Sequence, residues 1–345
     1  MSPLVTLALF LAASAPFAGN PASARNNAAG AQEQKSQSLA HARVLIQEGH
    51  FEEGISELQD LKRQNPSAKG LAHEFGIAYY KKGDYIKAIE SLKKASSEDP
   101  QDNEAVQLLG LSYYFAGNPS EAIPLLERVQ SWYPIANVDA SYVLGICYIH
   151  QRKYDQARRS FSTMYGVTPD SAPAYLFTAR MLLRQEFDPI AEEYAQKAIS
   201  LDPKLPLAHF FIGELYLFKS RIPEALEQFQ KELAINPAHS PTYYKLGDAY
   251  SRLLKFDEAE RALQRSIWLD STATGPYVLM GKVLLKKGEP ELAVRTLKHA
   301  LEMDPNNYIT HHLLGESYRA LGNSAESDRE LKLGEQLQSL ETSHP

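Results

Sequence analysis

The chain has 345 residues and a formal net charge of −6 at pH 7, with 44% hydrophobic and 23% charged residues. This composition is ordinary for a globular chain. Acidic and basic residues are interspersed, which argues against a nucleic-acid partner because such partners select a basic patch or stripe. The one cysteine, Cys147, cannot form an internal disulfide bond.

The N-terminal segment differs from the rest of the chain. Residues 4–15 form an apolar stretch, which is shorter than the roughly 20 residues of a membrane span. Small residues suited to cleavage stand at 13–15 and 22–24, before a polar linker. We expect a signal peptide at 1–24, a disordered linker at 25–34, no transmembrane span in the mature chain, and a periplasmic or secreted protein. No Lys or Arg precedes Leu4, so the alternative is an apolar leader on a cytoplasmic protein.

From residue 35 onward, one pattern recurs with a period of 34 residues. A closing proline stands at equivalent positions in most copies, namely Pro66, Pro100, Pro134, Pro169, Pro203, Pro237 and Pro305. Nine copies fit, beginning near residues 35, 69, 103, 138, 172, 206, 240, 274 and 308, with one residue added within 135–137. A period held over nine copies indicates a repeat protein, in which each unit packs on its neighbours.

Each copy has the pattern of two helices. In the second copy, residues 69–80 and 84–97 both space large apolar residues three and four apart, as amphipathic helices do. Gly83 between them is the residue type that ends helices in left-handed backbone. The closing proline stops the second helix, because proline lacks the donor that a helix interior needs. The expected fold class is therefore all-α, a stack of antiparallel helical hairpins over 35–341 with a short tail at 342–345.

Several landmark residues recur at fixed places within the copies. They include Leu109, Gly110 and Tyr113, then Leu246, Gly247 and Tyr250 in first helices, and Gly83, Tyr85, Ala88, Asp99 and Pro100 around one turn and second helix. The pattern resembles the tetratricopeptide repeat family and covers nearly all of the chain. The resemblance implies a right-handed superhelical solenoid of about nine helix-turn-helix repeats. The first and last copies depart from the pattern, as end repeats of solenoids usually do.

In that family, positions two, five, nine, twelve and thirteen of each copy line the concave side of the superhelix. Those positions here predict an apolar and aromatic groove with two arginines. The residues predicted to bind a peptide are Ile77, Tyr80, Leu111, Tyr114, Phe115, Tyr142, Ile146, Arg180, Arg184, Phe210, Phe218 and Tyr244. Exposed apolar patches usually mark interaction sites, and Arg180 and Arg184 would take an acidic group. The alternative is that tight superhelical packing, or a homodimer, buries these side chains.

No catalytic or metal-binding constellation is evident. His311 and His312 are adjacent, so on a helix their rings point about 100° apart and chelate a metal poorly. Cys147 and His311 occupy positions that packing residues fill in other copies, which predicts structural roles. The family's lysine and asparagine clamp for heat-shock chaperones is also missing. We therefore expect no catalytic residue, no metal, no cofactor and no small-molecule substrate.

Two classes of function remain open. The first is a non-catalytic scaffold or adaptor that binds a protein or peptide partner in its groove. The alternative is a regulatory or assembly subunit whose groove is buried in a stable homo- or hetero-oligomer. An enzyme is the weakest class, because the repeats occupy nearly the whole sequence.

Overall fold

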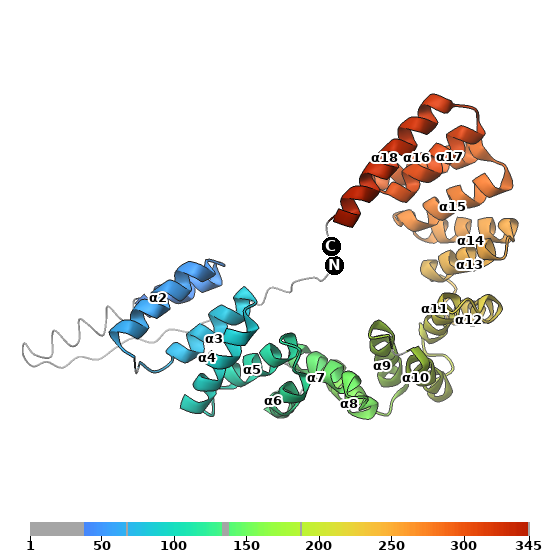
Figure 1. The fold of residues 1–345 in the computed structure, drawn as a ribbon. Coiled ribbons are helices and arrows are strands. Elements are labelled where there is room, and N and C mark those ends of the chain that lie inside the picture. The colour runs from blue at the N-terminus through green and yellow to red at the C-terminus, as the bar shows by residue number, and fades with distance from the viewer. Residues whose placement is uncertain (1–37, 67, 133–137, 187, 344–345) are drawn as a thin grey trace, which may run out of the picture. The chain divides into compact units, whose positions relative to one another are not determined.

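The computed structural model describes residues 38–66, 68–132, 138–186 and 188–343 (Figure 1). The predicted signal peptide at 1–24 and linker at 25–34 lie outside these residues. After helical residues 38–47, the helices are α2 (Phe51–Gln64), α3 (Leu71–Lys82), α4 (Tyr85–Glu98), α5 (Asn103–Phe115), α6 (Pro119–Trp132), α7 (Val138–His150), α8 (Tyr154–Tyr165), α9 (Ala172–Arg184), α10 (Asp188–Leu201), α11 (Ala208–Phe218), α12 (Ile222–Ile235), α13 (Ser240–Arg252), α14 (Phe256–Leu269), α15 (Thr274–Lys287), α16 (Pro290–Met303), α17 (Tyr308–Ala320) and α18 (Ser324–Ser343). The described part of the chain contains no strand, which confirms the all-α prediction.

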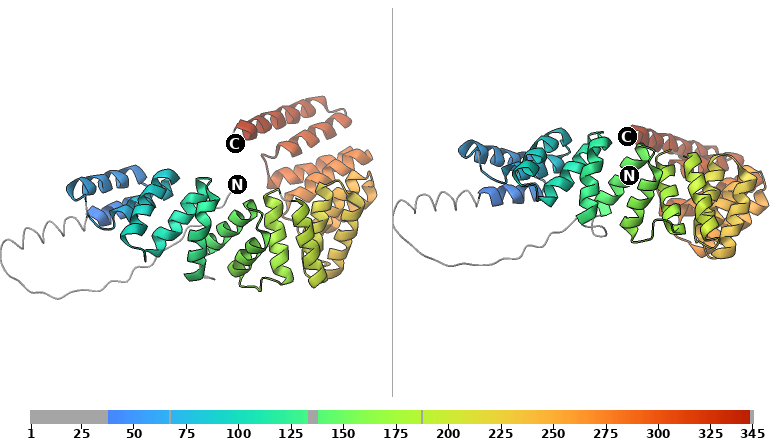
Figure 2. Two further views of the ribbon diagram at one scale, coloured as in Figure 1. Left: turned by 60° about the horizontal axis from the view of Figure 1, so that its bottom comes forward. Right: turned by 90° about the horizontal axis from the view of Figure 1, so that it is seen from below.

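The helices pack as hairpins, one for each copy of the 34-residue period. Helix α3 packs on α4, and α9, α11, α13, α15 and α17 each pack on the helix that follows them. First helices of neighbouring copies also contact one another, α11 with α13, α13 with α15, and α15 with α17. Figure 2 shows these hairpins side by side along the C-terminal part of the chain. The predicted solenoid of helical hairpins is confirmed.

The chain divides into two compact units, residues 1–129 and 130–345. The sequence predicted one continuous array, although the residue added to the period within 135–137 stands close to this division. Each unit has its own buried core. In the first unit Leu58 and Leu92 are fully buried, and in the second Leu263 and Leu297 are.

Close contact between the two helices of a copy explains the recurring glycine of the first helix. A Cβ atom at Gly213 would lie 2.5 Å from Cε1 of Phe229, whose side chain is fully buried. The fifth copy changes both sizes together: Ala179 stands in place of the glycine, and Ala195 stands in place of the large residue. A glycine faces a Leu or Phe at the equivalent position in other copies too, at Gly76, Gly110, Gly145, Gly247, Gly281 and Gly315. In these copies the approach of the two helices therefore depends on a paired choice of side-chain volume. The first copy differs, with Ala42 and Leu58 at the equivalent positions.

The turn within each copy needs one residue in left-handed backbone. Gly83 has a φ of 85°, and its N–H donates to the carbonyl of Tyr80 while Asp84 donates to Tyr79, which ends α3 as expected. Glycine fills this position in five copies, at Gly49, Gly83, Gly117, Gly288 and Gly322. Four middle copies use Arg152, Glu186, Ser220 and Leu254, with φ between 58° and 63°. Left-handed backbone costs about 1–2 kcal/mol for residues with a Cβ atom, so the middle copies carry local strain.

A buried carboxylate caps the start of α11. Glu232 of α12 is fully buried and accepts hydrogen bonds from the backbone N–H groups of Leu207 (2.9 Å) and Phe210 (3.3 Å). Helix α11 has no side-chain cap of its own at Leu207. Glu232 therefore satisfies donors that a Ser, Thr, Asp or Asn satisfies at most helix starts. This explains why Glu replaces the small residue found late in the second helix of most copies.

Candidate functional site

A group of four aromatic rings lies in the first unit, and we call it the aromatic cluster. It consists of Tyr80 of α3, Tyr85 of α4, and Tyr114 and Phe115 of α5. Phe115 is exposed and the three tyrosines are half-buried. The ring of Phe115 stacks on Tyr85 at 5.0 Å and lies 5.2 Å from Tyr114 and 6.3 Å from Tyr80, centroid to centroid. Phe115 remains 48% exposed. The structure thus brings three of the predicted groove residues together.

The hairpin geometry explains how the aromatic cluster forms. The left-handed turn at Gly83 reverses the chain, so the rings of Tyr80 and Tyr85 meet at 6.0 Å. Helix α5 packs on both α3 and α4, which places its last residue, Phe115, against both rings. These separations are those of favourable aromatic pairs. Tyr85 was not among the predicted site residues, because it begins a second helix and the family's groove positions lie on first helices.

Three predicted groove residues do not offer a free surface. Leu111 is only 5% exposed and Ile146 only 1% exposed. Ile77 is half-buried and packs against the core cluster that contains Leu71 and Phe75. The prediction is therefore corrected at Leu111 and Ile146, which are packing residues. At these two positions the alternative of groove side chains buried by packing holds.

The second unit places the other predicted aromatic residues in two settings. Tyr142, Phe210 and Tyr244 are half-buried. The ring of Phe210 lies 5.0 Å from that of His239 in an edge-on arrangement, and Tyr244 packs against the core of the C-terminal copies. Phe218, the last residue of α11, is 75% exposed. Phe218 is therefore the most accessible of the predicted apolar anchors.

Two arginines of α9 extend from one face of the helix. Arg180 and Arg184 are four residues apart, so they are neighbours on the helix surface. Both are exposed, and neither has a carboxylate partner among the residues that the structure describes. Guanidinium groups bind carboxylates in a bidentate geometry. That the pair holds an acidic group stays a prediction.

A histidine between two carboxylates links α3 to α5 in the first unit. His73 Nδ1 lies 2.5 Å from Oδ2 of Asp102, and its Nε2 lies 3.4 Å from Oε2 of Glu104. Hydrogen bonds to Glu104 and Asp102 raise the pKa of His73 to about 9, against an opposing effect of burial. His73 is therefore charged at neutral pH and joins two neighbouring copies electrostatically.

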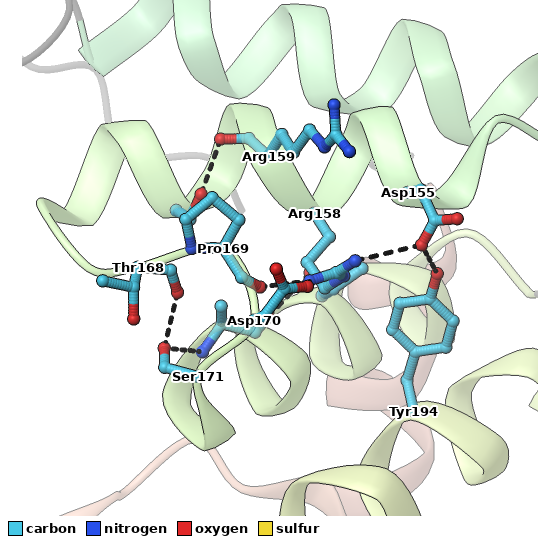
Figure 3. A network of polar contacts seen from close by, with 11 residues as sticks. Asp155, Arg158, Arg159, Thr168, Pro169, Asp170, Ser171 and Tyr194 are labelled. Atoms are coloured by element: carbon cyan, nitrogen blue, oxygen red, sulfur yellow. Dashed lines mark hydrogen bonds and ion pairs between the residues drawn. The ribbon is translucent and has the colours of Figure 1, made fainter.

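The second unit contains a polar network that was not predicted from the sequence (Figure 3). The guanidinium of Arg158 on α8 is nearly buried and donates to Asp155 (3.1 Å) and Asp170 (2.5 Å). It lies 4.3 Å from the ring centre of Tyr175, and Tyr194 donates its hydroxyl to Asp155 at 3.3 Å. The network fixes Tyr175 and Tyr194 in the wall of a cleft of about 870 Å³ formed by α8, α9 and α10. No pattern within a single helix could reveal it, because its members come from three helices and a turn.

The residues considered for other chemistry have structural positions. Cys147 is fully buried, and burial raises the pKa of its thiol to about 12. His311 is buried, with Nδ1 2.7 Å from Glu330 and Nε2 3.0 Å from the carbonyl of Pro305. The packing interpretation of both residues is confirmed. Within the described ranges, no cluster of three or more His, Cys, Asp or Glu could hold a metal ion, and no helix is long and apolar enough to cross a membrane.

Comparisons with known families match much of the chain. Profiles described as tetratricopeptide repeat match residues 39–103, 142–206, 240–272 and 275–307, which together exceed half of the sequence. A profile described as anaphase-promoting complex, cyclosome, subunit 3 matches residues 81–164. No curated protein matches the sequence.

Solved structures of repeat proteins resemble parts of the chain. MamA is 20% identical, over 48% of this chain and 97% of that one, with a TM-score of 0.45. YrrB, described as a TPR protein with an unusual peptide-binding site, is 24% identical over 49% of this chain and 88% of that one, with a TM-score of 0.44. PilF of Pseudomonas aeruginosa is 20% identical over 59% of this chain and 91% of that one, with a TM-score of 0.48. Because these TM-scores are below 0.5, the similarities carry no functional argument.

Proposed function

Because the chain belongs to the tetratricopeptide-repeat family, we propose that this interaction scaffold binds an extended or helical segment of a partner protein at the aromatic cluster. Members of the family are generally non-catalytic interaction modules. The observation that carries the proposal is the stacked, half-exposed ring of Phe115 among three tyrosines. Aromatic residues are among the types that contribute most binding energy at protein interfaces.

The geometry of the aromatic cluster supports an anchor site rather than a flat surface. Phe115 is held by rings on two sides, at 5.0 Å and 5.2 Å, so a partner side chain meets a rigid surface. Rigid aromatic side chains lose little conformational entropy on binding. Tyr85 adds a hydroxyl group that can bind the polar backbone of a peptide. An apolar side chain of the partner on Phe115 is the expected central contact.

The second unit contributes a different kind of anchor. Arg180 and Arg184 hold a carboxylate of the partner, because both are exposed and lack an acidic neighbour in the described part of the chain. Phe218 is available for an apolar side chain. We treat these residues as a separate contact region from the aromatic cluster.

A substitution in the aromatic cluster tests the proposal. The full chain with Phe115→Glu should lose partner capture in pull-downs from native extract, since the substitution places a charge among the rings. The matched control is Tyr165→Glu, because Tyr165 is 47% exposed and stacks on another ring, Phe177, at 4.1 Å. Retained capture by the Phe115 variant, or equal loss in both variants, would exclude the aromatic cluster as the binding site.

The alternative is a subunit whose aromatic surface is buried in a stable oligomer. Light scattering of the purified full chain separates the two. A monomer that grows only when partner is added supports the scaffold. A stable homo-oligomer that Phe115→Glu dissociates supports the alternative.

We also propose that the protein is exported. The support is the apolar stretch at 4–15 with small residues at 13–15 and 22–24. N-terminal sequencing of the protein recovered from cell fractions tests this. A chain that begins after residue 15 or 24 outside the cytoplasm is expected, and an intact Met1 on cytoplasmic protein would contradict export.

A further inference from the structure

The groove-facing side of the second unit carries a set of cations that we call the basic face. It consists of Arg180 and Arg184 of α9, Lys282 and Lys286 of α15, and Arg319 of α17. All five occupy the positions of their copies that the family assigns to the groove. All five are exposed, and none has a carboxylate partner among the described residues.

Of the four carboxylates at the same positions in the described second unit, two already have a cationic partner. Glu214 lies 2.9 Å from Nζ of Lys245, and Asp248 lies 2.9 Å from the guanidinium of Arg252. Asp139 and Glu316 are the two groove-position carboxylates of the described second unit that lack such a partner. The basic face therefore has a net positive charge, although the whole chain has a net charge of −6. A partner that matches it is negatively charged.

Exposed apolar side chains also occupy groove positions of their copies in this unit. Phe218 of α11 is 75% exposed, and Ile309 of α17 is 47% exposed. Helices α11, α13, α15 and α17 contact one another in series, and α9 joins them through α10, which packs on both α9 and α11. Charge alone suits any polyanion, but cations and exposed apolar side chains on the same series of helices suit a chain that carries both carboxylates and apolar side chains.

We infer that the basic face binds an acidic polypeptide segment in which apolar residues alternate with Asp or Glu. The carboxylates bind Arg180, Arg184, Lys282 and Lys286, and an apolar side chain covers Phe218. This inference rests on the proposed interaction function and specifies the chemistry of the partner. It extends the contact region of Arg180, Arg184 and Phe218 to α15 and α17.

The test uses fluorescence anisotropy with the full chain. The probe is a fluorescein-labelled peptide that repeats Glu-Leu-Glu-Phe, and a second probe replaces each Glu by Gln. We expect the acidic probe to bind at least roughly tenfold more tightly, because several exposed ion pairs of modest strength act together. Arg180→Glu/Arg184→Glu and Lys282→Glu/Lys286→Glu should each weaken the acidic probe by at least roughly tenfold and leave the Gln probe unchanged.

The control is Lys204→Glu/Lys332→Glu, which changes the net charge equally at two exposed residues outside the groove positions. Its affinity for the acidic probe should stay within about twofold of the wild type. Equal binding of both probes, equal loss in the control, or equally strong competition by single-stranded DNA of the same charge would overturn the inference. The pull-down with Phe115→Glu tests the aromatic cluster of the first unit in a separate experiment. The basic face can therefore fail to bind the acidic probe while partner capture through Phe115 is retained, and the reverse can also occur.

Discussion

The contact between Gly213 and Phe229 predicts that Gly213→Ala destabilises the wild-type chain but stabilises a chain that carries Phe229→Ala. Gly213→Ala would place a methyl group 2.5 Å from Cε1 and 2.7 Å from Cδ1 of the Phe229 ring. The ring is fully buried, so it must shift within the packed core to make room for the methyl group. Overpacking of this kind costs about 1–3 kcal/mol, and the better helix propensity of Ala offsets about 1 kcal/mol of it. We expect a net loss of about 1 kcal/mol in the free energy of unfolding.

The same substitution should stabilise a chain that already carries Phe229→Ala. That change alone costs about 3–5 kcal/mol, and it removes the ring that Gly213→Ala meets. The new methyl group then improves helix propensity by about 1 kcal/mol, and the fifth copy uses this combination naturally at Ala179 and Ala195. Urea unfolding of the four proteins, followed by circular dichroism, should give a coupling energy of about 2 kcal/mol. An equal effect of Gly213→Ala in both backgrounds would refute the close-contact explanation.

Three further predictions concern stability. Glu232→Ala should lower the free energy of unfolding by about 1–3 kcal/mol because buried N–H groups at the start of α11 lose their acceptor. Glu232→Gln keeps an acceptor oxygen, so thermal unfolding should show a smaller loss of stability. In denaturant titrations, Leu254→Gly should raise the free energy of unfolding by about 1 kcal/mol, and Gly83→Ala should lower it by a similar amount. A loss of stability in Leu254→Gly together with a gain in Gly83→Ala would refute the strain argument. His73 has a folded pKa of about 9, above its ordinary 6.5, so its stabilising effect is complete below pH 6.5 and is lost as the pH rises toward 9. Stability should fall by at most about 3 kcal/mol over that interval, and a fall that persists in His73→Gln would contradict the assignment.

The repeat period was the most informative feature of the sequence. Landmarks such as Gly83 and Pro100 recur at a fixed spacing, which can be read directly from the sequence. The burial of Cys147 and His311 followed from the same alignment of copies, because equivalent positions share an environment. The left-handed backbone at Leu254 was not predicted, although Leu254 occupies in its copy the position that Gly83 has in the second copy.

The candidate site was predicted in part. Position in the period placed Phe115 and Phe218 on accessible surface correctly, but it also selected Ile146, which neighbouring side chains bury. The position of a residue in the period does not indicate how tightly adjacent hairpins pack around it. It therefore cannot distinguish exposed groove residues such as Phe115 from buried ones such as Ile146. Tyr85 joins the aromatic cluster because α5 packs on both α3 and α4, which brings Phe115 onto the ring of Tyr85. The Arg158 network includes a residue outside the helices, Asp170, which lies in the turn between α8 and α9.

Site-specific photocrosslinking at position 115 in living cells tests the central claim most directly. A benzophenone side chain incorporated in place of Phe115 should form an adduct with another polypeptide, while the same group in place of the equally exposed Tyr165 should not. Absence of any adduct at position 115 while the protein is folded and present, or the same adduct from both positions, would contradict an aromatic cluster that binds a partner.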